Sequence, residues 1–130
     1  MRSIVLVDDS RVVREVLAAH PIAREVRVVD AGDGGEALAA IQVQLPDLVV
    51  ADLRMPRIGG VDLCRVLHSQ PRTRQVPVII LTSSLTPEIE ARCRKAGAAA
   101  VLAKPIQPQQ LLEEISRVLP SPPSGGALAP

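Results

Sequence analysis

Three carboxylates, a hydroxyl and an ammonium group stand at or just beyond the ends of short apolar runs in this sequence. They belong to Asp8, Asp9, Asp52, Thr82 and Lys104. If each run is a strand of one parallel sheet, the carboxyl ends of the strands meet at a single edge, which is where open α/β sheets bind ligands. The spacing therefore predicts one polar site built from these five residues.

A cluster of three aspartates needs a counter-ion. Two like charges about 4 Å apart repel by roughly 4 kcal/mol at an effective dielectric near 20. A hard divalent cation relieves this repulsion, and Mg²⁺ suits the set because it binds through one or two carboxylates and shares the rest of its shell with water and phosphate. Lys104 and Thr82 could then hold phosphoryl oxygens, one as a point charge and the other as a hydroxyl donor. The chemistry that the residues favour is phosphoryl transfer to a carboxylate.

Short apolar runs and segments of helical periodicity alternate five times along the chain. The runs have the composition of strands buried on both faces. They are Ile4–Val7, Val26–Val29, Leu48–Ala51, Val78–Leu81 and Ala100–Leu102. The apolar positions at helical spacing are Val12, Val13, Val16 and Leu17; Leu38, Ile41 and Leu45; Leu63, Val66 and Leu67; Ile89, Cys93 and Ala96; and Leu111, Leu112, Ile115, Val118 and Leu119.

Capping residues support two of these helices. Asp33 with Glu36 resembles a capping box, and Thr86-Pro87 places a capping hydroxyl and a proline at a helix start, with Gly97 at the other end. Alternating strands and helices with short loops imply right-handed crossovers. We therefore predict an α/β domain with a doubly wound, five-stranded parallel sheet and five helices.

Length and composition narrow the function classes. The chain has 130 residues, enough for one domain, with 47% hydrophobic and 22% charged residues, as in soluble globular domains. It contains no Phe, Tyr or Trp, so it lacks the aromatic platforms on which single-strand nucleic-acid binders stack bases. The net charge of +1 gives no overall attraction to DNA or to an anionic membrane. Direct nucleic-acid binding and membrane binding are therefore not expected.

Targeting and cysteine patterns point to a cytoplasmic protein. The sequence has no run of 18 apolar residues, and the run before the first aspartates is too short for a signal peptide. Cys64 and Cys93 could form a bridge or bind metal, but we expect reduced, partly buried thiols, and no zinc site with His20 or His68. The segment 120–130, PSPPSGGALAP, is expected to be a disordered tail or the start of a linker after a domain spanning 1–119.

The chain resembles the receiver (phosphoacceptor) domain of bacterial two-component response regulators. The resemblance covers residues 1 to about 119, with 43 residues from Asp9 to Asp52, 30 on to Thr82 and 22 on to Lys104. The run Asp8 to Arg14 is similar to chemotaxis-type, single-domain receivers. The motifs that carry the resemblance are Val7-Asp8-Asp9-Ser10, Asp52-Leu53-Arg54-Met55-Pro56 followed by Gly60, Leu81-Thr82-Ser83-Ser84 and Lys104-Pro105.

The resemblance implies a flavodoxin-like strand order, 2-1-3-4-5, and a set of roles. Asp52 would accept a phosphoryl group from a histidine kinase or a histidine phosphotransfer protein. Mg²⁺ would be bound by Asp9 directly, by Asp8 through water, by Asp52 and by the backbone carbonyl of Arg54. Thr82 and Lys104 would contact the phosphoryl oxygens, and the Lys104–Pro105 bond would be cis. The chain would act in signalling through an unidentified target protein, and it would not be an enzyme on other substrates.

One position departs from the family pattern. The family carries an aromatic ring three residues before the lysine, which fills the space vacated when the Thr82 hydroxyl moves toward the phosphoryl group; here this position is Val101. We expect phosphorylation to change the face formed by the fourth helix, fifth strand and fifth helix less than usual. The same face is a candidate surface for homodimer formation.

Parts of the sequence are also compatible with two other functions. Gly32 to Ala37 reads G-x-G-x-x-A, with Asp52 twenty residues after Gly32, which matches a dinucleotide-binding fingerprint but leaves Thr82 and Lys104 without a role. Alternatively, the chain is an interaction module with a vestigial pocket that holds its partner regardless of phosphate. The segment 53–104 holds nine basic and three acidic residues. Its exposed arginines are expected to be a solvated face, with an acidic partner surface as the alternative.

Overall fold

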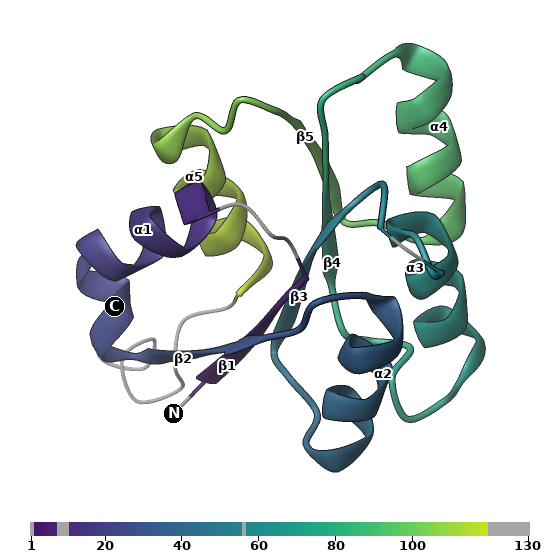
Figure 1. Ribbon diagram of the computed structural model, residues 1–130, viewed down its shortest axis with the longest axis horizontal. Coiled ribbons are helices and arrows are strands. Elements are labelled where there is room, and N and C mark those ends of the chain that lie inside the picture. Colours follow the sequence, from purple (N-terminus) through teal and green to yellow (C-terminus); the bar gives the residue numbers. More distant parts are fainter. Residues whose placement is uncertain (1, 8–10, 56, 120–130) are drawn as a thin grey trace, which may run out of the picture.

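The computed structural model describes residues 2–7, 11–55 and 57–119. It contains one five-stranded parallel sheet in the order β2-β1-β3-β4-β5. Helices cover both faces of this sheet, α1 and α5 on one side and α2, α3 and α4 on the other (Figure 1). The elements are β1 (Arg2–Val7), α1 (Arg11–Ala19), a 3-10 helix η1 (Pro21–Arg24), β2 (Val26–Asp30), α2 (Gly34–Val43), β3 (Leu48–Asp52), α3 (Gly60–Ser69), β4 (Val78–Thr82), α4 (Pro87–Ala96), β5 (Ala100–Ala103) and α5 (Pro108–Val118). The predicted fold class and strand order are confirmed.

The three central strands are buried on both faces, because their side chains alternate between two separate hydrophobic clusters. In β3, Val49 and Ala51 pack toward α2, α3 and α4, while Leu48 and Val50 pack toward α1 and α5. All four are fully buried. A strand with apolar neighbours on both sides needs a continuous apolar run, which is why the sequence shows runs rather than an alternating pattern.

The helix ends follow the capping signals in the sequence. The Asp33 side chain accepts a hydrogen bond from Glu36 N at 2.8 Å, and the Thr86 hydroxyl accepts one from Ile89 N at 3.1 Å. Gly97 ends α4 with φ +110°, in the left-handed region that glycine enters without steric cost. Helix α2 ends at Val43, before the Leu45 that the periodicity included, and Pro46 follows.

The start of α3 lies against the end of β3. Gly60 N donates to the Leu53 carbonyl at 3.0 Å, and a Cβ at Gly60 would meet the Asp52 carbonyl oxygen at 2.7 Å. Only glycine allows this close approach. The contact fixes the loop after β3, which is the loop that begins at the site aspartate.

Among the described residues, no helix is both long and apolar enough to cross a membrane.

Candidate functional site

The sheet register brings the ends of β3, β4 and β5 together. Asp52 pairs with Leu81 in the neighbouring strand, and Thr82 pairs with Ala103, the residue before Lys104. Lys104 N donates to the Thr82 carbonyl at 2.8 Å, which continues the ladder beyond β5. Three consecutive strands therefore deliver a carboxylate, a hydroxyl and an ammonium group to one edge of the sheet.

Asp52 and Lys104 form the central contact of this edge. Lys104 Nζ lies 2.8 Å from Asp52 Oδ2, at the distance of a charge-assisted hydrogen bond. The side chains are 23% and 19% exposed for Lys104 and Asp52, so the pair is shielded on most sides and still reachable from solvent. The other carboxylate oxygen, Oδ1, accepts a long bond of 3.3 Å from Arg54 N. Lys104 thus contacts one oxygen of the carboxylate, and Arg54 N contacts the other.

Thr82 lies in a more enclosed position. Its side chain is 2% exposed, and its hydroxyl oxygen accepts a hydrogen bond from Ser84 N at 3.1 Å. This bond orients the hydroxyl oxygen and leaves its proton to be donated elsewhere. The Lys104–Pro105 peptide bond is cis.

Two of the predicted metal ligands, Asp8 and Asp9, lie outside the described residues. The described part of β1 ends at Val7, which neighbours Ala51 of β3, so the carboxyl ends of these two strands are adjacent. Among the described residues, no group of three or more His, Cys, Asp or Glu could hold a metal ion. Asp52 is the predicted metal ligand that the structure describes with its side chain. Its carboxylate oxygens are hard donors of the type that Mg²⁺ binds.

Val101, at the position of the family's aromatic ring, is an ordinary core residue. It pairs with Ile80 and is 7% exposed, within the cluster that packs against α2, α3 and α4. A buried valine cannot turn between an outward and an inward rotamer as a ring can. Its place in the core fits the expectation of a smaller structural response on this side of the sheet.

The glycine-rich segment before α2 has its polar groups occupied. Glu36 Oε1 accepts a hydrogen bond from Gly32 N at 3.0 Å, and Asp33 caps the helix. A Cβ at Gly34 would meet Ile58 at 2.6 Å, so this glycine allows packing against the loop before α3. These three observations explain the glycine-rich segment as a capped helix start. They leave no need for a dinucleotide ligand to explain its residues.

Both cysteines are free thiols, and both are fully buried rather than partly buried as expected. Burial, with a smaller contribution from Cys93, raises the pKa of the Cys64 thiol to about 11. His68 Nδ1 lies 3.2 Å from the Cys64 carbonyl and 4.0 Å from its sulfur. A thiol held in its neutral form is a poor nucleophile, so this group belongs to the core.

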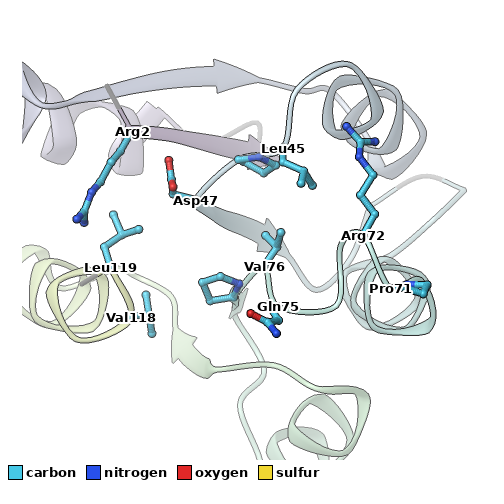
Figure 2. A pocket seen from close by; sticks show the side chains of 11 residues that line it. Arg2, Leu45, Asp47, Pro71, Arg72, Gln75, Val76, Val118 and Leu119 are labelled. Carbon is cyan, nitrogen blue, oxygen red and sulfur yellow. The ribbon is translucent and has the colours of Figure 1, made fainter. Parts of the chain in front are cut away.

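A hollow lies at the opposite, amino-terminal end of the sheet. Its volume is about 740 Å³, and Figure 2 shows Arg2 and Arg72 at its two ends. Two of its charged groups have partners: Asp47 accepts from Ser3 N at 2.8 Å, and Arg72 donates to the Gln42 carbonyl at 3.1 Å. Among the described residues that line it, the hollow has a single carboxylate, Asp47, and no serine, threonine, cysteine or histidine, so the chemistry belongs to the carboxyl edge.

The comparisons with known proteins agree with this site. Residues 4–116 match the response regulator receiver domain model. The gliding motility regulatory protein of Myxococcus xanthus is 41% identical over 101 residues, which are 78% of this chain and 13% of that protein. The chain thus spans a small part of that relative.

Solved structures show the same fold. A putative response regulator from Chloroflexus aurantiacus matches with a TM-score of 0.81 and 32% identity, covering 91% of this chain and 97% of that one. The receiver domain of a sensor histidine kinase from Pseudomonas aeruginosa, described with a magnesium ion coordinated in its active-site cleft, matches with a TM-score of 0.76 and 30% identity, covering 91% and 97%. The chain belongs to the response regulator receiver domain family.

Proposed function

We propose that Asp52 accepts a phosphoryl group from a histidine kinase or a histidine phosphotransfer protein in a Mg²⁺-dependent reaction. The observation that carries this proposal is the 2.8 Å contact between Lys104 Nζ and Asp52 Oδ2 beside the buried Thr82 hydroxyl. Phosphorylation and Mg²⁺ binding are characteristic of the family, and one solved relative is described with magnesium in its cleft. The chain would signal by changing how it docks to a partner protein.

The chain's own groups divide the work of the transfer. One Asp52 carboxylate oxygen attacks phosphorus, forming an O–P bond as the P–N bond to the donor imidazole breaks and that nitrogen keeps the electron pair. Lys104 neutralises charge on the transferred group, and the Thr82 hydroxyl donates to one of its oxygens. Mg²⁺, when bound by Asp8, Asp9, Asp52 and the Arg54 carbonyl, supplies further charge neutralisation on the phosphoryl oxygens.

The proposal is tested by intact mass spectrometry after incubation with acetyl phosphate, with and without Mg²⁺. The expected result is one phosphoryl adduct that requires Mg²⁺ and is absent from Asp52→Asn. Asp47→Asn is the matched control, because it makes the same change at the other end of β3 and should keep the adduct. No adduct in the wild type, even with a histidine phosphotransfer protein as donor, would favour the vestigial interaction module instead.

The switch is tested separately with a phosphate mimic, beryllofluoride. The added charge of about −1.5 to −2 draws in the Thr82 hydroxyl, and Lys104 N, bonded to the Thr82 carbonyl, transmits the movement to β5. We expect small amide shifts at residues 85–105, and restoring a ring with Val101→Tyr should enlarge them. Unchanged amide shifts in the wild type would contradict a phosphorylation-dependent face.

A further inference from the structure

We propose that the groove between α3 and α4 binds an acidic segment of a partner protein. The groove has a volume of about 280 Å³ and is lined by Leu53, Arg54, Gly59, Val61, Asp62, Arg65, Ile89 and Arg92. It lies beside the loop after β3 and contains none of the reacting groups Asp52, Thr82 and Lys104. The proposal does not depend on phosphoryl transfer, because it concerns the unmodified protein.

The charges of the groove do not balance. Three guanidinium groups line it, and the one acidic lining residue, Asp62, lies 3.6 Å from Arg65 Nη1. Within the described parts of the chain, the Arg54 and Arg92 side chains have no hydrogen bond or ion pair. Glu90, the nearest acidic residue before Arg92 in α4, pairs with Arg94 at 3.4 Å instead. Two arginines, Arg54 in the loop after β3 and Arg92 on α4, are therefore available to an external anion.

Three other arginines of this half of the molecule are used internally. Arg72 donates to Gln42, and Arg74 Nε donates to the His68 carbonyl at 3.3 Å. Arg94 pairs with Glu90 and also donates to the Ala99 carbonyl at 3.3 Å. The basic residues of segment 53–104 thus do not form a uniform solvated face. Some are paired within the molecule, whereas the Arg54 and Arg92 side chains are unpaired among the described residues and line this groove.

The floor of the groove is apolar and its wall is rigid. Leu53 and Ile89 are half-buried, and Val61 is 6% exposed. The Leu53 carbonyl accepts the Gly60 amide, and a Cβ at Gly59 would meet the same carbonyl oxygen at 2.8 Å. The groove is therefore formed before any partner arrives, which lowers the entropy cost of binding.

These features favour a protein segment over other anions. The volume is below the roughly 300–1,000 Å³ of small-molecule pockets, so the groove admits side chains. An apolar floor between basic walls suits a leucine or similar residue flanked by carboxylates. Nucleic acid is disfavoured because the chain has no aromatic residue on which a base could stack.

The test uses fluorescence anisotropy with a fluorescein-labelled peptide of alternating Glu and Leu, in low salt and without a phosphodonor. We expect saturable binding that weakens with salt, because the attraction is between exposed charges. Arg92→Glu should weaken binding about tenfold, since it replaces an attraction by a repulsion. Arg24→Glu is the matched control, because this substitution changes the net charge by the same amount. Arg24 is also exposed, and it lies on η1, away from the groove.

A second readout locates the peptide. Amide shifts should concentrate at Leu53, Gly59, Val61 and Ile89, and circular dichroism should show that both variants remain folded. Equal binding by Arg92→Glu and wild type, or shifts elsewhere, would overturn the proposal. No binding of the Glu-Leu peptide, or tighter binding of a single-stranded oligonucleotide or of a Lys-Leu peptide, would overturn it as well. Loss of phosphorylation in the earlier experiment would leave these results unaffected, so the two proposals fail separately.

Discussion

Two aspartates at the two ends of β3 show how position decides what a carboxylate does. Asp47, just before the strand, accepts a hydrogen bond from Ser3 N at 2.8 Å, while its own amide donates to the Ser3 carbonyl at 2.8 Å. Asp52, the last residue of the strand, faces Lys104 instead. The first carboxylate joins two strands at the amino-terminal end, and the second stands beside a cation at an edge open to solvent.

The same contrast holds for the two ends of the sheet. In the hollow at the amino-terminal end, Asp47 is bonded to the Ser3 amide and Arg72 to the Gln42 carbonyl. At the carboxyl end, three neighbouring strands finish in an acid, an alcohol and an amine. The presence of a cavity is therefore a poor guide to chemistry in this molecule, whereas convergent strand ends are a good one.

The largest effect should come from removing the cation at the carboxyl end. Lys104→Ala should slow phosphorylation by acetyl phosphate by about 10²- to 10³-fold, the range found when one preorganised charge stabiliser is lost. Arg2→Ala removes a cation at the opposite end and should leave the rate unchanged. Rates come from a time course of intact mass. Equal rates for Lys104→Ala and wild type would erase the functional difference between the two ends.

The next effect concerns the loop that carries Asp52. Gly60→Ala places a Cβ 2.7 Å from the Asp52 carbonyl oxygen and should lower the free energy of unfolding by about 1–3 kcal/mol, as overpacked sites do. Urea unfolding followed by circular dichroism measures it. Gly32→Ala is the control, because its Cβ would meet only the flexible end of Glu36 at 3.1 Å. A Gly60→Ala protein as stable as wild type would show that the loop is looser than the contact implies.

A smaller effect is expected at Thr82. Thr82→Val keeps the shape but removes the acceptor for Ser84 N, so the free energy of unfolding should fall by about 1 kcal/mol. Phosphoryl transfer should also slow, because one donor to the phosphoryl oxygens is lost. Thr82→Ser keeps the hydroxyl and should preserve both properties. If Thr82→Val transferred at the wild-type rate, the hydroxyl would have no part in the site.

The smallest effect sharpens the comparison of the two aspartates. Asp47→Asn keeps an oxygen that can accept from Ser3 N and loses only the charge, so the free energy of unfolding should fall by about 0.5 kcal/mol. Its phosphorylation should match wild type, in contrast to Asp52→Asn. A phosphorylation defect in Asp47→Asn would show that the amino-terminal end contributes to the reaction.

Hydrophobic pattern predicted the sheet because buried strands differ from amphipathic helices over four or more residues. It ended four strands one residue early: the observed strands include Asp30 in β2, Asp52 in β3, Thr82 in β4 and Ala103 in β5. Asp52 and Thr82 are still paired with residues of the neighbouring strands. A run of apolar residues cannot show this pairing, because both residues are polar. Hydrophobicity therefore does not identify Asp52 and Thr82 as strand residues. Their residue types and their spacing in the sequence identified them as site residues instead.

Other features depended on contacts between distant segments. The 3-10 helix η1, whose first turn His20 caps by accepting from Ile22 N at 3.1 Å, has no periodic signal over four residues. The arginines of the α3–α4 groove were visible in sequence only as a regional excess of charge. The packing of α3 beside α4 decides which of these arginines lack partners. The order of residues in the sequence does not show this packing.

The proposed phosphoryl acceptor is the carboxylate of Asp52, at the end of β3. The most direct test is to treat the protein with acetyl phosphate and Mg²⁺, reduce it with sodium borohydride, and sequence its peptides by mass spectrometry. Borohydride converts a phosphorylated aspartate to homoserine, which marks the site permanently. We predict homoserine at position 52 and unmodified aspartate at position 47. Homoserine at another carboxylate, or no homoserine anywhere in the chain, would contradict the claim.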